Sequence, residues 1–141
     1  MIEIVNNQRK IKIQIKDFQS FTESVVDSVK EAKGKSATVA FVSDRKMRGL
    51  NKEFRGKNST TDVLSFPFEA DEFESGENNL GDIIISVEQA EKQAKENDLN
   101  FETEIKQLIL HGVLHLCGYD HETDTGEMNK LELKLREKLG V

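Results

Sequence analysis

The sequence FETEIKQLILHGVLHL, residues 101–116, decides how this protein folds. Its apolar residues cover every side of a helical wheel, whereas a surface helix would confine them to one stripe. A helix that is apolar on all sides is normally buried at the centre of a domain. We therefore expect a central helix here, and its C-terminal half carries two histidines, His111 and His115.

Helical periodicity and capping residues predict four further helices, at about residues 18–32, 44–54, 87–95 and 126–139. Gly34 is expected to end the first of them through a left-handed turn. Ser43 and Ser86 are the expected N-caps of the next two. In the last helix, Met and Leu recur on one face with Glu and Lys opposite, so we expect it to pack on the outside.

Short apolar runs predict the strands, at residues 38–42, 63–66 and 81–85, with a strand or hairpin over residues 2–15. Together these elements predict an α+β fold: one mixed sheet of roughly four strands packed with about five helices, with the helix of His111 and His115 at the centre. Neither a repeat nor a linker divides the sequence, so we expect a single domain over residues 1–141.

The composition favours a soluble, cytosolic protein. Apolar residues make up 36% and charged residues 33% of the chain. No run approaches the ~18 apolar residues of a membrane span, and no secretory leader opens the sequence. The single cysteine, Cys117, excludes an internal disulfide and suits a reducing compartment. Because it lies two residues from His115, on another side of the helix, we expect Cys117 to be a small buried residue and not a metal ligand.

The charge is distributed unevenly. Lys+Arg 20 against Asp+Glu 26 gives a net charge of −6, which on the whole repels a polyanion. Residues 45–57, however, contain six lysines and arginines and one acid. A basic run of this kind suits either a solvated surface or a track for phosphate groups.

All three histidines lie between residues 111 and 121. His111 and His115 are four residues apart, so on a helix their rings share one face and can hold one ion. Gly118 can end the helix and bring His121 back beside that face. Three neutral imidazoles without a fourth protein ligand are typical of a catalytic zinc ion whose remaining position holds water. We therefore predict one zinc ion held by His111, His115 and His121.

Other interpretations of these histidines remain open. His111 and His115 could be core histidines with hydrogen-bond partners, although a largely apolar helix has little reason to carry two adjacent imidazoles. The metalloprotease motif HExxH has a glutamate as general base where this chain has Gly112, which disfavours peptide hydrolysis. A structural zinc would need a fourth ligand, such as Asp120.

The segment HGVLHLCGYDH, residues 111–121, resembles the signature of the YbeY family, bacterial zinc-dependent endoribonucleases and rRNA maturation factors. Other segments match that family in order and spacing, namely NKEFR at 51–55, TDVLSFP at 61–67 and LGDIIIS at 80–86. The resemblance therefore extends over essentially the whole chain.

This resemblance implies cleavage of single-stranded RNA, maturation of the 3′ end of small-subunit ribosomal RNA, and a role in ribosome quality control. The implied partners are ribosomal RNA and the small ribosomal subunit; the oligomeric state is left open. Within the basic run the resemblance points to Arg55, whose guanidinium can hold two phosphate oxygens and stabilise charge on the phosphate. Arg55 and the ligand His115 are thus the predicted catalytic residues.

Two alternative functions remain, a zinc-dependent protease or amidohydrolase and a non-enzymatic ribosome-binding module braced by zinc. Asp62, Asp82 and Asp120 could accept hydrogen bonds from the imidazole rings, but each also suits a turn or a cap.

Overall fold

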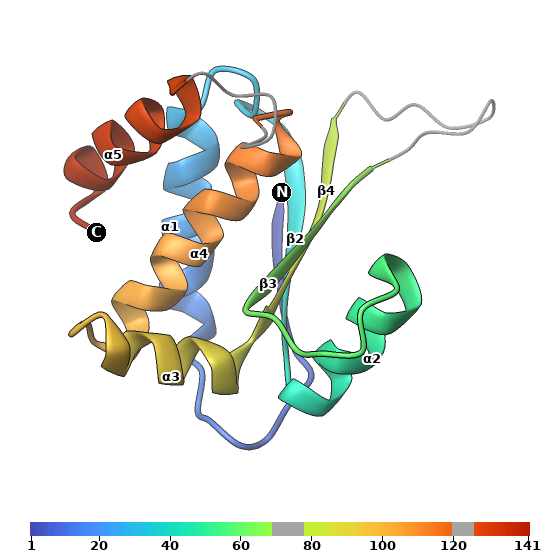
Figure 1. Ribbon diagram of the computed structural model, residues 1–141. Helices are drawn as coiled ribbons and strands as arrows, with labels where there is room; N and C mark the ends of the chain where they lie inside the picture. The colour runs from blue at the N-terminus through green and yellow to red at the C-terminus, as the bar shows by residue number, and fades with distance from the viewer. Residues whose placement is uncertain (69–77, 120–125) are drawn as a thin grey trace, which may run out of the picture.

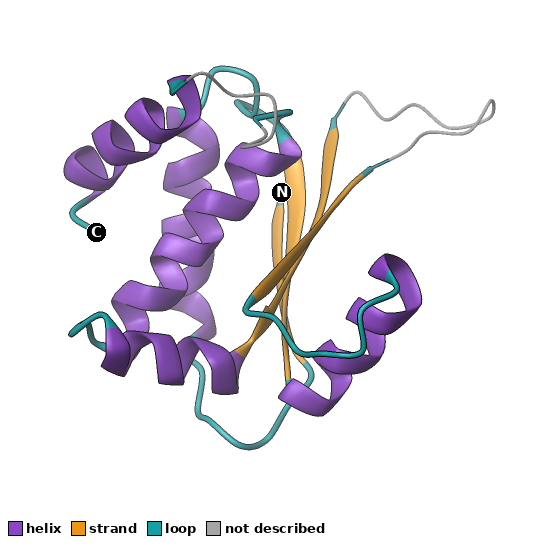
Figure 2. Ribbon diagram, in the orientation of Figure 1, coloured by secondary structure: helices purple, strands orange, loops and turns teal. Residues whose placement is uncertain are grey.

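A mixed sheet of four strands runs through the middle of the molecule, with helices on both faces (Figures 1 and 2). The computed structural model describes residues 1–68, 78–119 and 126–141. The strand order is β1-β2-β4-β3, in which β1, β2 and β4 are parallel and β3 is antiparallel to β4. The strands are β1 (Ile2–Asn6), β2 (Ser36–Val42), β3 (Val63–Pro67) and β4 (Asn79–Ser86). β3 is therefore an edge strand of this sheet.

The helices divide unequally between the two faces. On one face α1 and α4 pack side by side, with α5 outside them and α3 across their ends, whereas α2 covers the other face (Figure 1). The helices are α1 (Ile15–Ser28), α2 (Asp44–Arg55), α3 (Val87–Glu96), α4 (Phe101–Leu116) and α5 (Glu127–Leu139). These five helices of the described ranges and the mixed sheet confirm the predicted α+β class.

The central position expected for residues 101–116 is confirmed by the burial of α4. Its apolar side chains pack against α1, α3, α5 and the sheet, and the most buried include Ile105, Ile109 and Leu114. Gly112 brings the helix close to β4, because a Cβ atom at this position would lie 2.9 Å from Cγ2 of Ile83. The helix can therefore approach the sheet this closely only where it has no side chain.

A smaller second core holds α2 against the other face of the sheet. Met47 of α2 is fully buried beside Val42 and Leu64, and Phe66 packs around them. This cluster is much smaller than the main core, so α2 gains less from burial than α4 does.

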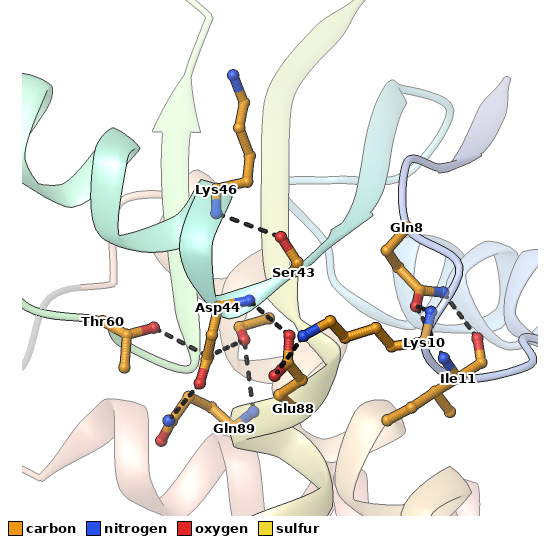
Figure 3. Close-up of polar contacts among 10 residues, drawn as sticks. Gln8, Lys10, Ile11, Ser43, Asp44, Lys46, Thr60, Glu88 and Gln89 are labelled. Carbon is orange, nitrogen blue, oxygen red and sulfur yellow. Dashed lines mark hydrogen bonds and ion pairs between the residues drawn. The ribbon is translucent and has the colours of Figure 1, made fainter.

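Hydrogen bonds to Asp44 fix the start of α2 (Figure 3). Its carboxylate accepts hydrogen bonds from the hydroxyls of Thr60 and Ser86 and from the amide of Gln89 at 3.0 Å. Its backbone N–H donates to Oε1 of Glu88 at 3.0 Å. Burial alone would raise the pKa of Asp44, but the hydrogen bonds from Ser86, Gln89 and Thr60 bring this pKa below its ordinary value. Asp44 thus joins α2 to the beginning of α3 and to the chain that leads into β3.

The N-terminal segment forms the strand of the predicted strand or hairpin, but not the hairpin. β1 forms, but residues 7–14 form no second strand. The side chain of Gln8 accepts hydrogen bonds from the backbone N–H groups of Lys10 and Ile11, which holds a turn there. Ile13 is nonetheless only 9% exposed. The alternating isoleucines here share neither strand pairing nor burial, since Ile15 is 40% exposed.

The first helix also differs in its limits. α1 begins at Ile15 and ends at Ser28, not over residues 18–32 as predicted. It stops because Val29 adopts an extended backbone, with φ −104° and ψ 119°. Gly34, with φ +79°, ends the turn that follows and not the helix itself. In the part of the chain that the structure describes, no helix combines the length and apolar character needed to cross a membrane.

Candidate functional site

The candidate site begins with the two histidines on α4. Their rings lie on one face of the helix, with centroids 4.6 Å apart, and Nε2 of His115 is 3.0 Å from Nε2 of His111. Two nitrogens that each lie about 2.0–2.1 Å from a tetrahedral zinc ion are separated by roughly 3.3 Å. The converging Nε2 atoms therefore fit two ligands of one metal ion with little adjustment.

A buried glutamate determines which nitrogen of His111 faces the site. Oε1 of Glu132, on α5, lies 3.1 Å from Nδ1 of His111, and the Glu132 side chain is only 7% exposed. A carboxylate accepts, so Nδ1 carries the proton and Nε2 keeps its lone pair for a metal or a donor. Arg136, one turn further along α5, lies 3.7 Å from the same oxygen. A carboxylate behind a ligating imidazole is a common arrangement at zinc sites.

A cavity of about 360 Å³ opens in front of the histidines, and it lies along β3. Its walls come from the end of α2, from the edge strand with the residues before it, and from α4. The lining residues are Arg55, Thr61, Asp62, Val63, Leu64, Ser65, His111 and His115. The cavity thus joins Arg55 to two of the predicted metal ligands, although they are 56 and more positions apart in the sequence.

Arg55 reaches this cavity from the opposite face of the sheet because it is the last residue of α2. Gly56 ends the helix in the left-handed conformation with φ +70°, and its N–H donates to the Lys52 carbonyl. The side chain of Asn51, itself 2% exposed, donates to the Ser59 carbonyl at 2.8 Å. These bonds fold the chain back from the end of α2 towards β3, which places Arg55 at the rim.

Behind the histidines a second cavity of about 290 Å³ contains further polar side chains, among them Asp62 and Glu132. The end of the Gln93 amide lies 3.1 Å from both Asp62 Oδ2 and Glu104 Oε1, and the amide orientation that satisfies both acids turns its NH₂ group towards them. Glu104 is 4% exposed, and burial, helped by the nearby Asp62 charge, raises its pKa. A neutral amide between two carboxylates keeps these acids in place without adding charge to the site.

The remaining predicted residues have different outcomes. His121 and Asp120 lie outside the described residues, so His121 as third ligand stays a prediction. Asp82 is exposed on β4. Oδ1 of Asp62 accepts a hydrogen bond from the N–H of Val63, as the side chain of a turn residue would.

Cys117 packs partly buried against the main core, and burial raises the pKa of its thiol to about 11. It therefore remains a protonated thiol near neutral pH, as expected for a small packed residue.

Glu132 was not among the residues that the sequence indicated. The helical pattern placed the glutamates of residues 126–139 opposite the apolar face, but Glu132 is buried between Met128 and Leu135 on the inner side of α5. The available signal was its spacing, since positions 128, 132 and 135 fall on one helical face. A carboxylate at such a position needs a buried partner, and His111 supplies it.

Comparisons with known proteins agree on one family. The family model described as Endoribonuclease YbeY matches residues 3–140. The endoribonuclease YbeY of Thermodesulfovibrio yellowstonii is 39% identical, covering 98% of this chain and 94% of that protein. The protein of the same name from Desulforamulus reducens is 40% identical, over 100% of this chain and 99% of that protein. A solution structure of a Thermotoga maritima protein matches with a TM-score of 0.67 at 30% identity, over 99% of this chain and 89% of that one.

Proposed function

This chain belongs to the endoribonuclease YbeY family, and from this premise we propose that it is a zinc-dependent endoribonuclease that cleaves single-stranded RNA. We place its action in ribosomal RNA processing, with maturation of the 3′ end of small-subunit rRNA and ribosome quality control as its roles in the cytoplasm. Its partners would then be ribosomal RNA and the small ribosomal subunit.

One observation carries this proposal: a single cavity is lined by both His111 and His115 and by Arg55. A metal-binding pair and a guanidinium are two kinds of group that promote phosphodiester cleavage, one by activating the reacting oxygens and one by stabilising charge on the phosphate. Arg55 comes from the end of α2, a helix whose start is fixed by the hydrogen bonds of Asp44 and which ends in the left-handed turn at Gly56.

His111, His115 and the predicted third ligand His121 would hold the zinc ion. When bound, zinc would polarise a phosphoryl oxygen and lower the pKa of coordinated water towards ~7. Glu132 would accept from Nδ1 of His111, so Nε2 would be the nitrogen of this ring that binds the zinc ion. Arg55 binds two oxygens of the phosphate and keeps the chain in place during cleavage.

The charge around the cavity supports a phosphate-bearing substrate. Lys52, Arg55 and Lys57 are exposed at the end of α2 and in the turn that follows. They form the part of the basic run nearest the cavity, so local attraction can oppose the repulsion expected from the net charge of −6.

The geometry of Gly112 argues against the protease alternative. A general base in the metalloprotease arrangement would occupy this position, where even a Cβ atom would meet Ile83 of the sheet at 2.9 Å. A glutamate there would face the core and not the cavity.

His115→Ala is the direct test of the proposal. We expect the rate of single-stranded RNA cleavage to fall by at least about 1000-fold. The zinc content of the purified protein should also fall, while its helix content changes little. Glu102→Ala, an exposed position on the same helix, is the matched control and should retain both properties. Undiminished cleavage by a highly purified His115→Ala protein would contradict the proposed site.

A comparison of two substrates, single-stranded RNA and the protein casein, separates the nuclease from the protease alternative. Zinc-loaded wild-type protein should cleave single-stranded RNA and lose this activity with a chelator, whereas casein should remain intact. Cleavage of casein alone would favour the protease alternative instead.

A further inference from the structure

We propose that Phe54 is a stacking platform for a base of single-stranded RNA, next to the nucleotide whose phosphate Arg55 holds. This proposal rests on the proposed function, because it assumes an RNA chain in the cavity beside β3. It assigns the base-binding part of that substrate site to one exposed side chain near the end of α2.

The first observation is the exposure of Phe54. It continues the apolar face of α2, on which Met47 is fully buried and Leu50 half-buried, but Phe54 itself is 58% exposed. A phenylalanine that only completed the small second core would gain from covering its ring. Phe54 instead keeps more than half of its surface in water, among charged neighbours.

The second observation is that Phe66 fixes the orientation of this ring. The two ring centroids are 5.1 Å apart and the planes are inclined by 65°, an edge-to-face contact. In this geometry Phe66 covers at most one face of the Phe54 ring. A flat surface is thus held in place before a ligand arrives, which reduces the entropy lost on binding.

The third observation is the position of the pair beside the cavity. Arg55 follows Phe54 in the chain and Ser65 precedes Phe66, and both Arg55 and Ser65 line the cavity in front of the histidines. Ser65 and Phe66 are successive residues of a strand, so Ser65 faces the cavity and Phe66 faces α2. The Phe54 ring therefore lies across the β3 edge from the histidines, and a base reaches it where the RNA chain passes over this edge beside Arg55.

The charges around Phe54 indicate what kind of ligand would stack on it. Lys52, Arg55 and Lys57 are exposed nearby, against the single acid Glu53. An apolar ring within a basic surface favours a ligand that combines negative charge with flat aromatic groups. Single-stranded RNA has both, because each phosphate is followed by a base with two open faces.

A fluorescence experiment tests the contact itself. The chain contains no tryptophan, so Phe54→Trp introduces a single reporter, and Leu133→Trp introduces one at an apolar residue on α5 that is 54% exposed. The ligand is a short 2′-O-methyl oligonucleotide added to the zinc-loaded protein. We expect emission of the Phe54→Trp protein to be quenched on binding, whereas that of the Leu133→Trp control stays constant. Saturable binding without quenching at position 54 would overturn the proposal.

A kinetic experiment tests how much the Phe54 ring contributes to RNA binding. Phe54→Leu keeps an apolar side chain against Phe66 but removes the aromatic ring, so it should raise the KM for single-stranded RNA about 5- to 100-fold while kcat changes less than about twofold. Phe54→Tyr should restore the KM, and Leu133→Ala should leave it unchanged. An unaltered KM in Phe54→Leu, with a melting temperature near that of the wild type, would contradict the assignment.

The two experiments separate this inference from the proposed function. If wild-type protein binds RNA but does not cleave it, the fluorescence result still decides whether Phe54 contacts a base. Sedimentation of Phe54→Leu is measured alongside: a change in oligomeric state at constant RNA affinity would show that the ring contacts a second copy of the chain, which also overturns the proposal.

Discussion

The two walls of the cavity are built in different ways. The α4 wall carries His111 and His115 on a helix that belongs to the main core, and Glu132 supports it from behind. The α2 wall carries Arg55 at the end of a helix that rests on a small second core and on the hydrogen bonds of Asp44. Buried side chains hold α4 along most of its length, whereas side-chain hydrogen bonds fix the start of α2 (Figure 3).

This difference fits a division of tasks. The proposed metal ligands would need to be held within a few tenths of an ångström, which a buried helix achieves because its side chains have few alternative positions. A group that captures a long flexible substrate gains from exposure and positive charge, which α2 provides. Substitutions in the α4 wall should therefore affect metal binding, and substitutions in the α2 wall should affect RNA and leave the metal in place.

Arg55→Ala should produce the largest effect on the α2 side. We expect a loss of about 100-fold in kcat on single-stranded RNA, because one preorganised donor to the phosphate is removed, with an unchanged zinc content. Arg48→Ala, an exposed position on the same helix outside the cavity lining, is the control and should stay within about twofold of wild type. Loss of zinc in Arg55→Ala would show that the two walls are not independent.

Glu132→Gln should weaken metal binding without affecting the α2 wall. The amide keeps an acceptor near Nδ1 of His111 but removes the negative charge, so we expect the zinc affinity to fall about 10- to 100-fold. Competition with a chromophoric chelator measures this change, and Glu137→Gln at an exposed position of α5 is the control. Equal zinc affinity in both variants would remove Glu132 from the support of the site.

Gly112→Ala tests how closely the α4 wall is packed. The added methyl group would meet Ile83, which is fully buried, so we expect a loss of about 1–3 kcal/mol in the free energy of unfolding, measured by urea denaturation. Gly49→Ala on α2 is the matched substitution, since open space surrounds its Cβ position, and it should stabilise the protein by about 0.4–1 kcal/mol. Equal stability of the two variants would show that the main core accommodates an added methyl group as easily as the exposed face of α2 does.

Asp44→Asn should have the smallest effect. It should lower the stability of the fold at the start of α2, by an amount that depends on pH. The pKa of Asp44 is lower in the folded protein, so its ionised form stabilises the fold above the ordinary aspartate pKa of about 4. This stabilisation is lost as the pH falls through the lowered pKa. We expect the variant to be less stable than wild type by about 1 kcal/mol at pH 7 and closer to it at pH 3, by thermal denaturation. A constant difference between the two pH values would contradict this role.

The sequence predicted the α4 wall better than the α2 wall, for physical reasons. Helical spacing places His111 and His115 on one face whatever the rest of the fold does, so the i, i+4 pair could be recognised directly. Arg55 is one cation in a basic run, and only the family resemblance distinguished it, because its approach to the histidines depends on tertiary folding around β3.

Two further residues show where pattern reading reached its limit. Glu132 was assigned to the exposed face of α5, because a carboxylate is usually solvated and its buried partner lies on another helix. Ile13 follows the alternating pattern of a strand. A buried side chain outside a sheet can give the same pattern as one on a paired strand, and Ile13 is buried without pairing.

The position of β3 at the margin of the sheet also bears on solubility. An open strand margin is a template on which a second polypeptide can add, the first step of many aggregation reactions. β3 is only five residues long and ends at the exposed Pro67, which has no N–H to offer an incoming strand. The cationic Arg55 lies beside it as well. The protein can thus leave this margin accessible to its substrate while making it a poor surface for self-association.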